Sequence, residues 1–363
     1  MNHNLQQLRK LGQSLWLDNI TRELLDSGTL ARDIADYGLT GLTSNPTIFD
    51  EAIGNSEAYD AAIREKCANG LQREALFIEL ALEDLRRAAD LFLPAHRASD
   101  GVDGWVSMEV SPLLAGDTAG SIEAAARIHR QAARDNLFIK IPGTPEGVPA
   151  IEESIFNGIP VNVTLLFSAR QYLAVAEAYM RGIQRRLDAN RDPVVGCVAS
   201  LFVSRWDKAI KDKVPAELRN HLGVAIGQRT YRAYRALLAS DRWRRLAEAG
   251  ARPQRLLWAS TSTKDPAAPD TLYVTSLAAP DTINTMPEAT LRAYAEHGEL
   301  QGAMDADGGD SELVLARFAK AGIDTEALAA QLQRDGAQSF VKSWQDLMQR
   351  IETKATALEH ASP

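Results

Sequence analysis

Short apolar runs alternate with longer stretches in which apolar residues recur at helical spacing along most of this chain. Such alternation is typical of a parallel sheet whose strands are joined by helices. Eight of the short runs are predicted as strands, at residues 14–19, 41–46, 104–110, 136–142, 160–167, 194–202, 255–261 and 271–278. Eight parallel strands close a barrel, so the pattern predicts an α/β fold of the TIM (β/α)8 type.

Two helical segments extend beyond this barrel pattern. Residues 52–97 are long enough for two or more helices and are predicted as an insertion on the outside of the barrel. Residues 311–358 are predicted as a helical C-terminal tail, with Gly322 and Gly336 as breaks. No linker-like composition, internal repeat or low-complexity segment separates them from the barrel. We therefore expect one domain over residues 1–363, with the barrel strands between residues 14 and 278.

Polar residues fall on one face of strand after strand. Side chains alternate between the two faces of a strand, so Asp18 shares its face with Ser14, whereas Leu15 and Leu17 point the other way. The same parity places one set of polar residues inside the barrel: Asp18, Asn45, Glu109, Lys140, Asn162, Thr164 and Ser200. Each lies toward the C-terminal half of its predicted strand, the end at which barrel enzymes carry their active sites.

Lys140 is the only charged side chain in the apolar run 137–142. A strand this apolar is expected to be buried, and burial disfavours a charged ammonium and frees the nitrogen as a nucleophile. A lysine near a strand end that reaches solvent is the alternative. Such an amine, without a cofactor motif, is suited to attack a carbonyl and form a Schiff base. Asp18 and Glu109 are candidates for the base and the proton relay of that chemistry.

Composition and charge exclude several other functions. The formal net charge of -8 argues against nucleic acid or a membrane surface as a partner, because both are anionic. The N-terminus lacks a signal-peptide pattern and no run of 18 apolar residues occurs, which predicts a cytoplasmic protein. No Gly-rich dinucleotide or Walker-type loop is present, and two distant cysteines, Cys67 and Cys197, indicate neither a disulfide framework nor a thiolate metal cage. We expect no cofactor and no metal.

Ordered motifs along nearly the whole chain resemble the transaldolase family. They are Ser14-Leu-Trp-Leu-Asp18-Asn, Leu42-Thr-Ser-Asn45-Pro-Thr, Ser107-Met-Glu109-Val, Phe138-Ile-Lys140-Ile-Pro, Val161-Asn162-Val-Thr164-Leu-Leu-Phe167-Ser, Val198-Ala-Ser200-Leu-Phe-Val-Ser-Arg205 and Trp258-Ala-Ser260-Thr-Ser-Thr-Lys264. The likeness is greatest to the longer bacterial transaldolases, which carry extra helices and an extended tail.

This resemblance implies that Lys140 transfers a dihydroxyacetone unit from sedoheptulose 7-phosphate to glyceraldehyde 3-phosphate, giving erythrose 4-phosphate and fructose 6-phosphate. By the family's pattern, Asp18 takes the proton of the C4 hydroxyl. Glu109 shuttles protons with a water held partly by Thr164. Asn45 and Asn162 hold hydroxyls of the dihydroxyacetone moiety, and Ser200 assists nearby. Such an enzyme acts on sugar phosphates in the pentose phosphate pathway. The residues leave two oligomeric states open for this chain, a monomer and a homodimer.

The resemblance also implies a phosphate site at the ends of the sixth and seventh strands. Arg205, three residues past Phe202, is expected to bind the substrate phosphate; its alternative is a surface pair with Asp207. Many transaldolases have a second arginine at the position of Ser262, where this chain has none. The nearest cation is Lys264, and we expect Ser262 and Lys264 to replace that arginine. A solvated loop lysine is the alternative for Lys264.

Three rival functions are each disfavoured by a feature of the sequence. A lyase of the same fold, similar to fructose 6-phosphate aldolase, would release dihydroxyacetone; that branch is much shorter and has a tyrosine where this chain has Phe202. A metal-dependent barrel enzyme should carry histidines at strand ends, but the six histidines here fall in the tails or helical patterns. A catalytically silent barrel is disfavoured because the lysine, acid and base occur together.

Overall fold

A closed barrel of eight parallel strands forms the centre of the molecule. The computed structural model describes residues 2–360. The strands are β1 (Ser14–Asp18), β2 (Gly41–Thr43), β3 (Val106–Glu109), β4 (Leu137–Pro142), β5 (Val161–Leu166), β6 (Cys197–Phe202), β7 (Arg255–Ala259) and β8 (Thr282–Met286). Neighbours follow the order β2-β1-β8-β7-β6-β5-β4-β3, and a parallel bridge between Gly41 and Trp105 joins the two ends. The predicted TIM barrel is confirmed.

The eighth strand does not lie where the sequence pattern placed it. Residues 271–278 contain α13 (Leu272–Ser276), and the strand that closes the barrel begins at Thr282, beyond the predicted limit of residue 278. The β-branched and aromatic residues of this run favoured a strand. In the structure Tyr273, Val274 and Leu277 are buried together, which is the i, i+1, i+4 spacing of one helical face.

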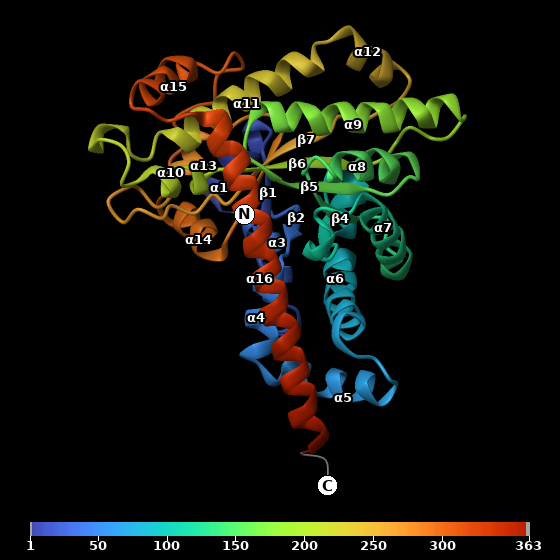
Figure 1. The fold of residues 1–363 in the computed structure, drawn as a ribbon. Helices are drawn as coiled ribbons and strands as arrows, with labels where there is room; N and C mark the ends of the chain where they lie inside the picture. Colours follow the sequence, from blue (N-terminus) through green and yellow to red (C-terminus); the bar gives the residue numbers. More distant parts are fainter. Residues whose placement is uncertain (1, 361–363) are drawn as a thin grey trace.

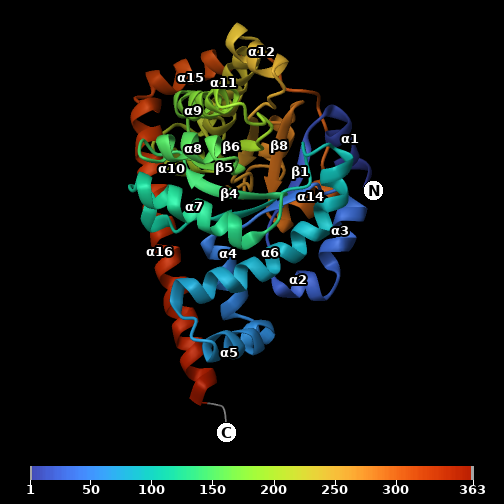
Figure 2. The same ribbon diagram turned by 90° about the vertical axis from the view of Figure 1, so that its right-hand side faces the viewer.

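Helices surround the barrel and extend below it (Figures 1 and 2). They are α1 (His3–Leu11), α2 (Arg22–Asp26), α3 (Thr29–Tyr37), α4 (Pro46–Gly54), α5 (Asp60–Ala68), α6 (Arg73–Ala98), α7 (Thr118–Ala132), α8 (Gly147–Phe156), α9 (Ala169–Asp188), α10 (Ser204–Ile210), α11 (Leu222–Leu238), α12 (Asp241–Glu248), α14 (Glu288–His297), α15 (Ser311–Lys320) and α16 (Thr325–His360). None of the helices between residues 2 and 360 combines the length and apolar character needed to cross a bilayer.

The long helix α16 lies across the barrel and continues down along α4 and α5 (Figure 1). Its lower half is attached by ion pairs from Arg350 to Asp50, at 2.5 Å, and from Lys354 to Asp60, at 2.8 Å. The predicted break at Gly336 is wrong, because α16 runs through this residue without interruption. Gly336 is needed there for space: a Cβ atom would lie 2.9 Å from the Leu165 side chain and 3.1 Å from the Arg205 guanidinium.

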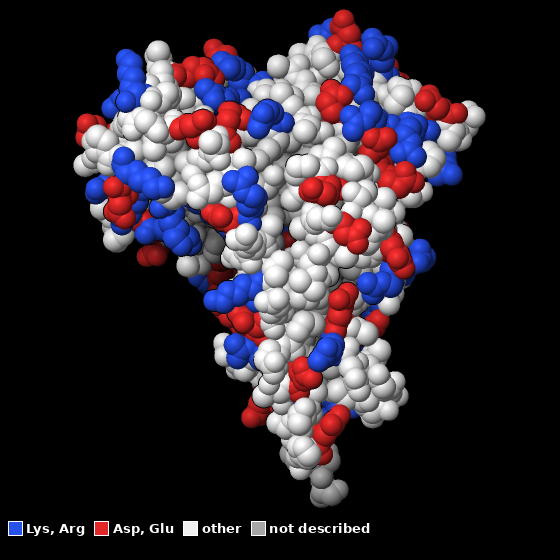
Figure 3. All heavy atoms as spheres, in the orientation of Figure 1, with Lys and Arg blue, Asp and Glu red and all other residues white. Residues whose placement is uncertain are grey.

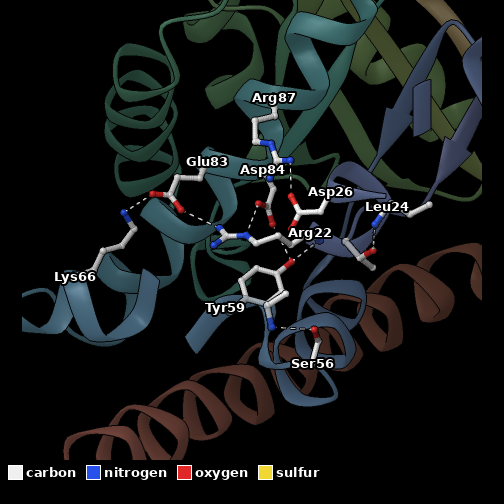
Figure 4. Close-up of polar contacts among 11 residues, drawn as sticks. Arg22, Leu24, Asp26, Ser56, Tyr59, Lys66, Glu83, Asp84 and Arg87 are labelled. Carbon is white, nitrogen blue, oxygen red and sulfur yellow. Dashed lines mark hydrogen bonds and ion pairs between the residues drawn. The ribbon is translucent and has the colours of Figure 1, made fainter. Parts of the chain in front are cut away.

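A buried charge cluster joins the segment after β1 to α6 (Figure 4). Arg22, at the start of α2, donates to Asp84 and to Glu83, each at 2.9 Å. Tyr59 donates to the other carboxylate oxygen of Asp84 at 2.8 Å, and Asp84 is fully buried. Because Arg22 lies four residues after Asp18, the cluster holds the chain segment that leaves the strand carrying this candidate base.

We predict that Arg22→Met destabilises the protein by about 3–5 kcal/mol, since it leaves the Asp84 carboxylate buried without its cation. Urea unfolding would measure the loss. Arg134→Met is the matched control, because Arg134 pairs with Asp90 on the surface and such pairs contribute about 0–1 kcal/mol. If Arg22→Met lowered the free energy of unfolding as little as the surface control does, the cluster would not stabilise the fold.

Candidate functional site

A cavity of about 480 Å³ opens at the C-terminal ends of the strands. It is lined by most of the predicted site residues: Asp18, Asn45, Lys140, Thr164, Ser200, Phe202, Arg205, Ser262 and Lys264. Glu109 and Asn162 are the neighbours of Lys140 in the barrel register, on β3 and β5 respectively. The structure therefore brings the whole predicted set to one end of the barrel.

The Lys140 amine is buried and held in one position. Its side chain, on β4, donates to the Ser44 carbonyl at 2.6 Å, and the residue is 5% exposed. The Glu109 carboxylate lies 3.9 Å from the Lys140 nitrogen. A nitrogen placed between a carbonyl and a carboxylate, at the floor of an open cavity, is well placed to attack a substrate carbonyl that enters from the mouth.

Glu109 is a buried carboxyl group whose surroundings suit it to proton transfer. Burial raises its pKa, an effect that the positive charge of Lys140 partly opposes. Within residues 2–360, neither carboxylate oxygen has a hydrogen-bond partner, and the same is true of the Thr164 hydroxyl. Buried polar groups in native proteins are usually satisfied. Unpaired oxygens beside Lys140 are therefore suited to exchange protons with a reacting group.

Asp18 lies at the end of β1 and is held by a threonine. Burial raises its pKa, whereas a hydrogen bond from Thr43 and the charge of Lys140 lower it. The Thr43 hydroxyl is 2.7 Å from Asp18 and 2.7 Å from the Thr285 hydroxyl. Sequence reasoning missed both threonines. Thr43 has the same parity as Asn45 and could have been found by that signal; Thr285 was hidden by the misplaced eighth strand.

Asn45 and Asn162 present their amides in different ways. Asn45 lies beyond β2, where it caps α4 by accepting from the Ile48 backbone N–H at 3.1 Å, so the NH2 group of its amide stays free of the cap. Asn162 accepts from Ser200 at 2.7 Å and donates to Ser107 at 3.3 Å. These bonds fix the Asn162 amide next to Lys140.

Arg205 provides a positive charge in the wall of the cavity. It lies in the first turn of α10, with its guanidinium 4.9 Å from the centre of the Phe202 ring and 5.6 Å from that of Phe340. Burial lowers its pKa, and the negative charge of Glu109 opposes this shift. The alternative pairing with Asp207 does not occur: this carboxylate accepts instead from the backbone of α11 and from Tyr273.

Lys264 and Ser262 lie at the rim of the same cavity. The Lys264 amine donates to the Ser262 hydroxyl at 2.6 Å, and both residues line the cavity that contains Arg205. The bond to Ser262 directs the Lys264 amine toward the mouth of this cavity. The side chain is nevertheless exposed, as a solvated loop lysine would be.

Helix α16 completes the wall of the cavity. Ser339 and Phe340 line it, and the buried Gln333 donates to the carbonyls of Gly143, at 2.9 Å, and Leu165, at 3.0 Å. Gly143 follows β4 and Leu165 follows Thr164, so one side chain holds the ends of both strands. Leu165 has φ 58° where the β5–β6 register shifts. No local sequence signal marks these tail residues, because their role depends on tertiary contact.

Comparison with known proteins identifies the family. The model of the transaldolase/fructose-6-phosphate aldolase family matches residues 15–351. The chain belongs to this family. It is 43% identical to the transaldolase of Thermobifida fusca (strain YX), over 98% of this chain and 100% of that one. It is 42% identical to the transaldolase of Saccharopolyspora erythraea, over 96% and 97%, and 38% identical to transaldolase 2 of Nostoc sp. (strain PCC 7120), over 99% of each.

The family assignment agrees with the donor set of the cavity, which is an amine, two carboxyls, amides and hydroxyls. Within residues 2–360, no group of three or more His, Cys, Asp or Glu side chains is arranged to hold a metal ion. Cys197 is buried, Cys67 is half-buried, and neither forms a disulfide.

Proposed function

We propose that this protein is a transaldolase that transfers a dihydroxyacetone unit from sedoheptulose 7-phosphate to glyceraldehyde 3-phosphate through a Schiff base on Lys140. The products are erythrose 4-phosphate and fructose 6-phosphate. The observation that carries this proposal is the buried amine of Lys140 with Glu109 at 3.9 Å and Asp18 in the same cavity. Full-length relatives named transaldolase support it.

The first stage joins substrate to Lys140. The nitrogen attacks the ketone carbon, the carbonyl oxygen takes a proton, and the resulting carbinolamine loses water to give the Schiff base. Glu109, whose pKa is raised by burial, gives and takes the protons of these steps. The Thr164 hydroxyl, also without a partner among the described residues, positions the water that carries them.

The second stage breaks and remakes a carbon-carbon bond. Asp18 takes the proton of the C4 hydroxyl, the C3–C4 electrons move into the iminium to form an enamine, and the aldose leaves. The enamine then attacks the aldehyde of the acceptor while Asp18 returns the proton. Asn45, Asn162 and Ser200 hold the hydroxyls of the three-carbon unit, which keeps it on Lys140 between the two aldoses.

Arg205 is the proposed partner of the substrate phosphate, with Ser262 and Lys264 in place of a second arginine. A guanidinium can bind a phosphate through two parallel hydrogen bonds, and an ammonium adds a point charge. The rings of Phe202 and Phe340 hold the Arg205 guanidinium, and no ion pair within residues 2–360 competes for it.

The phenyl ring of Phe202 favours transfer over release of dihydroxyacetone, because it brings no hydroxyl that could protonate the enamine. We also propose that the protein is cytoplasmic, is a monomer or a homodimer, and has no nucleic-acid partner.

The function is tested with fructose 6-phosphate as donor and erythrose 4-phosphate as acceptor. We expect sedoheptulose 7-phosphate and glyceraldehyde 3-phosphate to form together, with little free dihydroxyacetone. Asp18→Ala should slow turnover by about 10²–10⁴-fold, the usual value of general base catalysis. Release of dihydroxyacetone at the same rate with and without acceptor would instead establish the lyase.

The acid limb of the pH profile tests the environment of Asp18. The base works only when ionised, and burial raises its pKa, so kcat/KM should fall at a higher pH than an ordinary aspartate would give. Thr43→Val removes the hydrogen bond that favours the carboxylate. Its limb should therefore shift to still higher pH, and Thr43→Ser should restore it. Thr29→Val, in the first turn of α3, is the control, because the Thr29 hydroxyl bonds only to Ser27 and Arg32 at the surface among the described residues. Superimposed profiles for all four proteins would contradict this assignment.

A further inference from the structure

A second cavity, of about 370 Å³, lies beside the sugar-phosphate mouth. Its walls come from α10, the segment between α10 and α11, and the loop after β7. Lys264 lines both cavities. Part of the wall between them is a contact of 2.8 Å between the hydroxyls of Ser204, in the second cavity, and Ser260, in the mouth.

Four exposed cations from three separate segments line this second cavity: Lys208, Lys211, Arg219 and Lys264. The Lys264 amine itself donates to Ser262, in the mouth. Figure 3 shows Lys and Arg side chains, with some Asp and Glu side chains among them, over α10 and the loops around it, on the left of that view. Within residues 2–360, Lys208 and Arg219 form no ion pair, whereas Lys211 pairs at 3.8 Å with Asp265, which also lines the cavity. Grouped like charges repel one another, so this arrangement favours an incoming anion.

The two carboxylates in the lining, Asp207 and Asp265, also accept hydrogen bonds from uncharged groups. Asp207, which is buried, accepts from the Leu222 and Gly223 backbone N–H groups and from Tyr273. Asp265 accepts from Asn220 at 3.0 Å and from a backbone N–H at 3.1 Å. These bonds tie the α11 terminus, α13 and the loops together. They give the cavity a fixed shape and leave it with more positive than negative charge.

We infer that this cavity is a second anion site that binds a phosphate group, either free phosphate or that of a small phosphorylated metabolite. Arg219 offers a bidentate fork and the lysines offer point charges, the combination that suits a phosphate dianion. Because Lys264 lies on both cavities, a phosphate bound here alters the affinity of the mouth for sugar phosphates, and the reverse holds by linkage. Lys264 apart, the residues that line this cavity differ from those that line the sugar-phosphate cavity.

Calorimetric titration with inorganic phosphate at low ionic strength tests the inference. Arg205→Ala weakens phosphate binding in the sugar-phosphate cavity. The phosphate binding that remains in this variant therefore reports the second cavity. Adding Lys208→Ala and Arg219→Ala should weaken it at least about tenfold, whereas adding Arg317→Ala and Lys320→Ala on α15 removes equal charge elsewhere and should not. Equal affinity in the two triple variants, or loss of all binding in Arg205→Ala alone, would overturn the inference.

Two further arms identify the source of the phosphate and separate this inference from the proposed function. Titration with glycerol 1-phosphate should show the same dependence on Lys208 and Arg219. Tighter binding of this ester than of inorganic phosphate would identify a phosphorylated metabolite, and weaker binding would identify the free ion. The Lys208→Ala/Arg219→Ala double variant should retain transfer activity, because neither side chain lies in the mouth. Failure of the second site would thus leave the transaldolase proposal intact.

Discussion

The enclosure of three titratable groups at one end of the barrel is the constraint on which the rest of the site depends. Removing an ion from water costs several kcal/mol even inside a real protein. Lys140, Asp18 and Glu109 share this cost, and burial raises the pKa of both carboxyls while the lysine opposes the rise. A proton taken up by one group therefore changes the proton affinity of the other two. A reaction with several proton transfers requires such coupling.

Elements far from these groups in sequence keep them in position. The Arg22–Asp84 cluster holds the segment that follows Asp18, and Gln333 holds the ends of the strands that carry Lys140 and Thr164. Phe340 holds Arg205 from the same helix as Gln333. Helix α16 is thus part of the site as well as of the outer surface, and its ion pair with α4, between Arg350 and Asp50, connects it to the helix that Asn45 caps.

Most of the barrel and of the polar set could be predicted from the sequence, because side-chain alternation is a local property of a strand. Parity alone placed Asp18, Glu109 and Lys140 together. The predicted position of the eighth strand was wrong, because the run 271–278 carries β-branched and aromatic residues yet contains a helix. Gly336 looked like a helix break, but its missing side chain makes room for Arg205. The contributions of Gln333 and Phe340 depend on where α16 docks, which no local pattern records.

Covalent trapping on Lys140 tests the central claim most directly. Borohydride reduction in the presence of fructose 6-phosphate should leave a reduced three-carbon unit on this lysine, located by peptide mass spectrometry. Lys140→Met should give no adduct, and Lys264→Met should still give one on Lys140. An adduct on another lysine, or an unmodified Lys140 in an active enzyme, would contradict the Schiff-base account.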